Sequence, residues 1–250
     1  MTGKRLKQIA GWLGILIWVL CLSAAGAEEN QTAEENLAAH GFSAEEIILQ
    51  QIRFIPDGTE IRFPITENPR PLYLWFDVTG DGCVDFCSTR MFGSGMVRTE
   101  MTVYDPVLQK KYILDGYNYN FLPDSVTEDR LVVIKNGPHG YGEPIFDVRG
   151  TVILVDDLLL FVADPEEAEG FDPAQAAVSA EQAARIAYVH VRNYMEGKFC
   201  SDAAVAPGEC GGKLCWVVSL IDVGLPRYTV HVNMETGEVE NAVDVRAAAE

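Results

Sequence analysis

An acidic stretch at residues 77–85 constrains the fold more than any other part of the chain. Side chains that carry oxygen recur there at close to every second position. Calcium takes about six to eight oxygen ligands around one point, and a short chain surrounds such a point only by turning sharply. Gly80 and Gly82 permit that turn, because glycine reaches positive φ without a Cβ clash. We therefore predict a calcium site. Its ligands are the side chains of Asp77, Thr79, Asp81 and Asp85 and the backbone carbonyl of Cys83.

The flanks of this loop indicate strands, not the helices of an EF-hand. Residues 72–76 are rich in aromatic and apolar side chains, which is typical of a strand. The twelfth loop position is Ser88, where an EF-hand has a bidentate Glu. The loop resembles the calcium loops of FG-GAP and VCBS-type β repeats, which carry a D-x-[DNT]-G-D-G-x-x-D pattern, and it occurs in a single copy. The alternative is a glycine turn whose acidic side chains are merely solvated.

The chain is strongly acidic, with a formal net charge of −18 over 250 residues. Such a surface repels nucleic acid and anionic lipid, so we expect no nucleic-acid partner. A hydrophobic content of 48% is ordinary for a globular protein and argues against a disordered chain.

The N-terminal residues 1–27 have the pattern of a secretory signal peptide. Three basic residues precede an apolar run at 9–22, and the sequence Ala25-Gly26-Ala27 is a small-residue cleavage site. We therefore expect a secreted or extracytoplasmic protein with no stable membrane insertion once the signal is removed. The alternative is an uncleaved anchor, because the apolar run with its flanking alanines approaches the length that spans a bilayer.

Five cysteines remain after signal removal, namely Cys83, Cys87, Cys200, Cys210 and Cys215. Disulfides are the usual expectation outside the cytosol, and an odd number leaves one thiol over. The last three lie close in sequence, so we expect one bridge around a loop there, with its pairing open. Their spacing is not that of a zinc site or a redox motif.

The middle of the chain has the pattern of an antiparallel β domain, at residues 57–163. Short runs with a period near two alternate with turn residues. The predicted strands are 72–76, 84–89, 98–104, 111–114, 130–135, 144–148, 151–155 and 158–162. An acidic helical segment at 28–56 precedes this domain, with a capping box that begins at Ser43. An acidic, proline-containing linker at 164–176 follows it.

The last region, at residues 177–250, combines a helix with two strands and a turn. Ser179 and Gln182 form a capping box before an alanine-rich helix, Trp216 lies in a strand-like run, and Thr236-Gly237 makes a tight turn. This order resembles the PepSY family, whose pattern is a Ser-capped helix, a W-x-V-x-L strand and a strand that ends before T-G-E-V. The resemblance implies a partner-binding domain associated with peptidase inhibition, and it supplies no catalytic residue. We read residues 200–212 as an inserted loop.

Together these patterns predict an α+β protein in which an antiparallel β domain precedes a small PepSY-like domain of one helix and an antiparallel sheet. The predicted function is that of a secreted, non-enzymatic calcium-binding protein whose partner is a protein, in particular a secreted peptidase. One alternative is a secreted hydrolase with a site near Asp85 and His139. Another is a cell-envelope or adhesion module.

Overall fold

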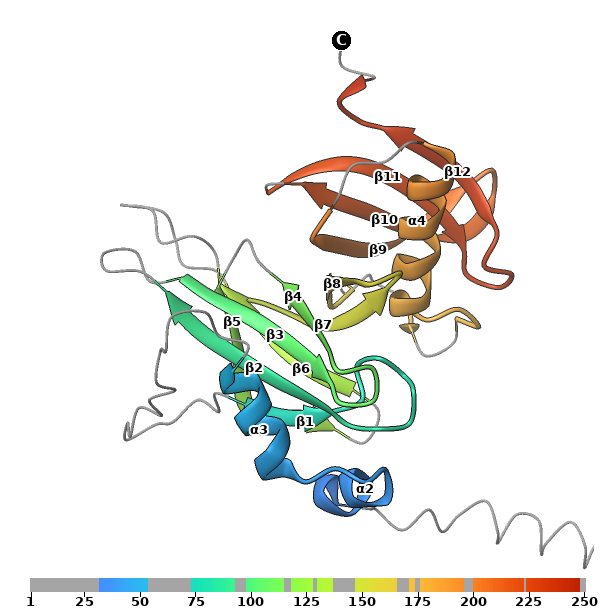
Figure 1. Ribbon diagram of the computed structural model, residues 1–250. Coiled ribbons are helices and arrows are strands. Elements are labelled where there is room, and N and C mark those ends of the chain that lie inside the picture. The colour runs from blue at the N-terminus through green and yellow to red at the C-terminus, as the bar shows by residue number, and fades with distance from the viewer. Residues whose placement is uncertain are drawn as a thin grey trace, which may run out of the picture.

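The structure is a computed structural model that describes residues 32–53, 73–92, 98–114, 118–127, 130–136, 147–165, 171–173, 176–195, 200–222 and 224–247 (Figure 1). The predicted signal peptide and His139 lie outside the described residues. Within the described residues, no helix is both long enough and apolar enough to cross a membrane.

Three helices and twelve strands make up the described part of the chain. The helices are α2 (Ala33–Ala39), α3 (Ala44–Arg53) and α4 (Ala180–Tyr194). The strands are β1 (Tyr73–Phe76), β2 (Asp85–Phe92), β3 (Arg98–Asp105), β4 (Lys110–Leu114), β5 (Asn118–Thr127), β6 (Arg130–Asn136), β7 (Asp147–Val155), β8 (Leu158–Ala163), β9 (Asp202–Cys210), β10 (Lys213–Asp222), β11 (Leu225–Asn233) and β12 (Val239–Asp244).

The predicted α+β fold class is wrong, because strands dominate the described residues and form two large sheets. One sheet has four strands in the order β1-β2-β3-β4, and the other has eight in the order β12-β11-β10-β9-β8-β7-β6-β5. The second sheet is mixed, since β8 pairs with β9 in parallel while its other neighbouring strands pair in antiparallel fashion. The expected loop at 200–212 is also wrong, because most of it is the strand β9.

The four-stranded sheet packs on the β5–β8 half of the larger sheet. The core between them is formed by side chains such as Val103 on β3, Phe121 on β5, Val133 on β6 and Phe161 on β8. The helices α2 and α3 cover the outer face of the smaller sheet through Leu37 and Ile47, which pack with Phe86 on β2. These elements therefore form three layers, seen in the lower part of Figure 1.

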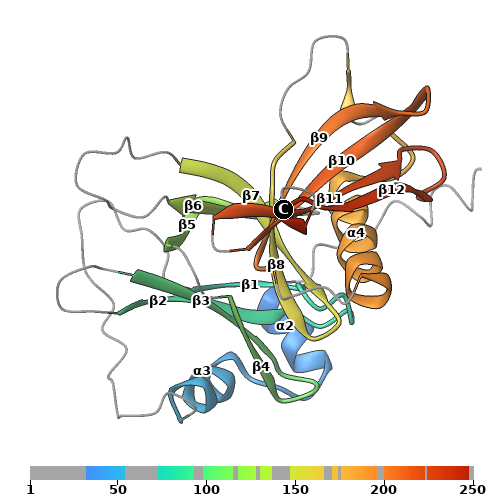
Figure 2. The same cartoon turned by 90° about the horizontal axis from the view of Figure 1, so that it is seen from above.

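Helix α4 covers the other half of the large sheet, beside β9–β12 (Figures 1 and 2). Its predicted capping box is confirmed: the Ser179 side chain accepts from the Gln182 N–H, and the Gln182 side chain accepts from the Ser179 N–H. Buried alanines on α4 permit close approach to Trp216, which is fully buried on β10. The Trp216 Nε1–H donates to the Val178 carbonyl at 2.7 Å, which satisfies the one polar atom of this side chain.

The strand β8 links the two cores, because it is buried on both faces. Leu160 and Val162 pack in the core beneath α4, whereas Leu159 and Phe161 pack against the four-stranded sheet. Its neighbour β9 comes after the predicted linker at 164–176. The pairing of β8 with β9 therefore joins the strands on both sides of the linker into one sheet.

A buried ion pair joins the two sides of this linker. Lys135 Nζ on β6 lies 3.1 Å from Asp202 Oδ2 at the start of β9, and the Tyr119 hydroxyl donates to Asp202 Oδ1 at 3.3 Å. Burial raises the pKa of Asp202, while Lys135 acts in the opposite direction. Removing one partner of such a pair leaves an uncompensated buried charge.

We expect Lys135→Met to lower the free energy of unfolding by roughly 3–5 kcal/mol at alkaline pH, because the buried Asp202 is then charged and has lost its cationic partner. Chemical denaturation measures this loss. The matched control is Lys213→Met, which breaks the more exposed pair with Glu240 and should cost less than about 1 kcal/mol. Equal losses in the two variants would show that the Lys135–Asp202 pair contributes no more than a surface contact.

Candidate metal centre

The acidic stretch forms the connection between β1 and β2, as the flanking strands predicted. Gly80 and Gly82 have φ of 76° and 86°, so the predicted left-handed turn is confirmed at both positions. An added Cβ would meet no atom within 4 Å at either glycine. Backbone conformation, not crowding, is therefore what requires glycine here.

The Asp77 carboxylate organises the first half of the loop. Its Oδ1 accepts from the N–H groups of Gly80 at 2.6 Å and Asp81 at 3.2 Å, and its Oδ2 accepts from Gly82 at 2.9 Å. The more exposed Asp81 accepts from the Cys83 N–H at 2.8 Å. Each carboxylate thus closes the loop by binding backbone amides.

The Asp85 side chain, at the start of β2, is fully buried and binds the backbone of the loop. Its Oδ2 accepts from the N–H groups of Val78 at 2.8 Å and Thr79 at 2.9 Å. The Thr79 hydroxyl lies 3.5 Å from Oδ1 of both Asp77 and Asp85. Three of the predicted ligands, Asp77, Thr79 and Asp85, are therefore brought together around one hydroxyl.

An asparagine on α2 fixes the other side of the loop. Asn36 Nδ2 donates to the Gly82 carbonyl at 3.1 Å, and its Oδ1 accepts from the Val84 N–H at 2.9 Å. In a trans peptide the carbonyl points opposite to the following N–H. The Cys83 carbonyl, which is the predicted backbone ligand, therefore points away from α2.

Negative charge is concentrated at the base of this loop. Burial raises the pKa of Asp85 to about 7, two backbone amides act against this, and the charges of Asp105 and Asp77 raise it further. Burial also raises the pKa of the Cys83 thiol to about 11, and Asp81, Asp85, Asp77 and Asp105 add to that rise. Four carboxylates therefore share the surroundings of Cys83. Sequence reasoning missed Asp105, because it lies outside the acidic stretch, directly after the predicted strand at 98–104.

The described residues contain no group of three or more His, Cys, Asp or Glu side chains already arranged to hold a metal ion. The physical reason is that the loop carboxylates turn toward different backbone amides. A carboxylate has about four lone-pair sites, so these amide bonds leave each of them able to accept a further partner.

No disulfide joins any of the five cysteines among the described residues. Cys83 packs beneath α2 and α3, whereas Cys87 packs between the two sheets, so they lie on opposite faces of the small sheet. Cys200 precedes β9 and Cys210 ends it, which separates them by roughly 25 Å or more along an extended strand. A bridge between Cys200 and Cys210 is therefore excluded. Cys215 lies opposite Gly208, two residues before Cys210 on the neighbouring strand. Burial raises the pKa of Cys200 to about 12, which does not favour a reactive thiolate.

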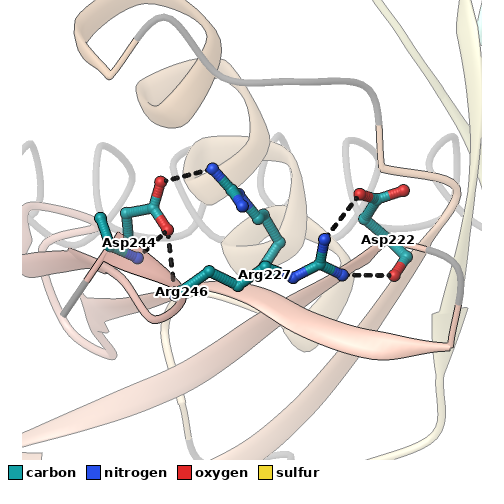
Figure 3. Close-up of polar contacts among 5 residues, drawn as sticks. Asp222, Arg227, Asp244 and Arg246 are labelled. Carbon is teal, nitrogen blue, oxygen red and sulfur yellow. Dashed lines mark hydrogen bonds and ion pairs between the residues drawn. The ribbon is translucent and has the colours of Figure 1, made fainter. Parts of the chain in front are cut away.

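A second charged cluster joins the ends of β10, β11 and β12 (Figure 3). Arg227 lies 3.0 Å from Asp244, and Arg246 binds both the side chain of Asp222 at 3.5 Å and its carbonyl at 3.1 Å. Asp244 also accepts from the Arg246 N–H at 3.1 Å. Two arginines are matched by two aspartates, so this cluster fixes the C-terminal segment to the sheet.

No protein-family model, curated protein or solved structure matches this chain. The resemblances of residues 77–85 to FG-GAP loops and of residues 177–250 to the PepSY family therefore stay predictions.

We expect the raised pKa of Asp85 to make cation-free protein less stable as pH rises from about 4 to about 7. The folded state holds this proton more tightly than the unfolded state, so the stabilisation is complete below the unfolded pKa and is lost above the folded one. At about 1.4 kcal/mol per pKa unit the change reaches up to about 4 kcal/mol.

Denaturation in chelator across this pH range, for the wild type and for Asp85→Asn, isolates the effect. The substitution keeps an oxygen that accepts from Val78 and Thr79 but cannot titrate. The difference between the two unfolding free energies should change with pH, and a constant difference would contradict the assignment.

Proposed function

We propose that this chain is an exported calcium-binding protein without enzymatic activity, and that the loop between β1 and β2 binds the ion. The observation that carries the proposal is the burial of Asp85 beside other carboxylates. Besides burial, two neighbouring aspartates, Asp105 and Asp77, are among the largest causes that raise its pKa. A buried carboxylate is normally paired with a cation, with a metal or with a proton.

The donor set suits a hard divalent cation. Carboxylate, hydroxyl and backbone carbonyl oxygens are the ligands that calcium takes, and its flexible coordination tolerates an irregular loop. Asp77, Thr79 and Asp85 already lie close together, and the Asn36 contacts hold the Cys83 peptide in place. A bound ion would supply the positive charge that these carboxylates lack.

The consequence for the fold is local. Val78, within the loop, packs in the core between the two sheets, and Cys83 packs beneath the N-terminal helices. Calcium bound by the loop would therefore stabilise both the loop end of the small sheet and the packing of α2 against that sheet. We propose that the protein uses extracellular calcium for this purpose, in keeping with the signal pattern of residues 1–27.

The partner implied by the PepSY resemblance is a protein, in particular a secreted peptidase. The surface that would bind it lies on α4 and β9–β12. The hydrolase and envelope interpretations also stay predictions.

We expect calcium to raise the melting temperature of the wild type by a few degrees relative to chelator. Loops of this class bind at roughly 10⁻⁵ to 10⁻³ M, and calcium at about 1 to 100 times Kd stabilises the folded state by about 0.4 to 2.7 kcal/mol. For a chain of this size, about 1 kcal/mol shifts the midpoint by roughly 2–4 °C. Magnesium should do less, because it demands a tighter octahedron and keeps its waters.

The variant Asp81→Asn tests the loop itself. Asparagine still accepts from the Cys83 N–H but carries no charge, so most of the calcium-dependent rise should disappear. Glu209→Gln, an exposed acid on β9, is the control and should keep the full rise. Identical wild-type melting curves in calcium and in chelator would show that the loop is a solvated turn.

A further inference from the structure

A row of residues crosses the four-stranded sheet at the end where the loop begins. Phe76 on β1 pairs with Asp85 on β2, and Asp105 on β3 pairs with Lys110 on β4. The two halves of the row meet because Phe86, the residue after Asp85, pairs with Tyr104, the residue before Asp105. One step further along this antiparallel ladder, Asp85 and Asp105 lie opposite each other.

Both carboxylates are on the inner face of the small sheet. Phe86 and Tyr104 pack on the outer face beneath α2 and α3, and successive strand residues point to opposite faces. Cys87 and Val103, the next residues on the side of Asp85 and Asp105, pack in the core between the sheets. Like charges directly opposite each other on one face destabilise a sheet, so this pair needs a compensating group.

Asp105 is almost completely buried, at 1% exposure, and only one of its two carboxylate oxygens has a hydrogen-bond partner among the described residues. Its Oδ1 accepts from the Leu108 N–H at 2.9 Å, which closes the turn after β3. Its Oδ2 is buried and makes no hydrogen bond with any described residue. Buried polar atoms in folded proteins nearly always have a hydrogen-bond partner. Burying a charged oxygen without a partner costs more free energy than burying most other polar atoms.

The nearest basic residue in the row does not fill this role. Lys110 lies opposite Asp105, but its Nζ is 2.8 Å from Asp157 Oδ1 and lies 4.9 Å from the centre of the Tyr112 ring. The hydrogen bond to the Asp157 side chain is the largest cause of the raised pKa of Lys110, and the charge of Asp105 contributes less. Lys110 is therefore held toward the exposed turn between β7 and β8.

We infer that Asp105 is a further ligand of a divalent cation at this loop, and that Asp85 and Asp105 together form the buried half of the site. This inference rests on the proposed function and extends it, because the site then takes a ligand from β3 as well as from the loop. Cation binding would join β2 to β3 directly, and not only β1 to β2. The four carboxylates around Cys83, those of Asp77, Asp81, Asp85 and Asp105, would then all contribute negative charge to one cation site.

Calcium titration calorimetry on the full-length chain tests the role of Asp105. We expect Asp105→Asn to weaken calcium binding by roughly tenfold or more, because ligand charge sets the affinity of such sites. In chelator the same variant should melt at a higher temperature than the wild type, since asparagine still accepts from Leu108 and one of two facing charges is gone. A residue with a purely structural role would not give these opposite effects.

Asp105→Ser is the second variant, because serine also accepts from a nearby N–H at the start of a turn, and Glu209→Gln is the control. Wild-type affinity in a folded Asp105 variant, with binding lost in Asp81→Asn, would overturn the inference and leave the loop site standing. Absence of calcium binding by the wild type would overturn both proposals. Weaker binding in the Asp105 variants with unchanged binding in Glu209→Gln supports the inference.

Discussion

The burial of β8 on both faces is the constraint on which the rest of the structure depends. Its sequence is a continuous apolar run, and parallel or central strands that are covered on both sides have this composition. One face packs against the small sheet and the other lies under α4. The two cores therefore share one strand, and neither half of the chain can bury its apolar surface without it.

The position of the candidate metal centre follows from this packing. The inner face of the small sheet packs against β5–β8. The residues at the loop end of that face are therefore buried as well. Those residues are Asp85 and Asp105. The glycine turn and the contacts of Asn36 then hold Asp77 and Asp81 in the adjoining loop. Packing thus supplies the burial of the two acids, and the loop supplies the oxygen donors around them.

Sequence reasoning located the local features of this protein well. The positive φ of Gly80 and Gly82, the capping box at Ser179 and most strands follow from residues within a few positions of one another, and such short-range signals can be read from the chain. Three strands were predicted at 144–148, 151–155 and 158–162. The structure has β8 at the last of these, whereas β7 joins the first two into one strand.

The fold class and Asp105 depend on pairings distant in sequence, and local patterns do not contain them. The α+β prediction failed because β9 was assigned to a cysteine-rich loop, so the strand that continues the large sheet was not counted. Its glycine, alanine and proline content gives a weak strand signal. Asp105 became significant only when the ladder placed it opposite Asp85, twenty residues earlier in the chain.

A crystal structure grown with a lanthanide in place of calcium tests the central claim most directly, because the anomalous signal locates the ion without assumptions about ligands. The account predicts one peak at the base of the loop, bound by carboxylate oxygens of both Asp85 and Asp105 and by loop residues among Asp77, Thr79 and Asp81. The absence of this peak, with the Asp77 and Asp85 carboxylates still bound only to backbone amides and the Thr79 hydroxyl, would contradict the account.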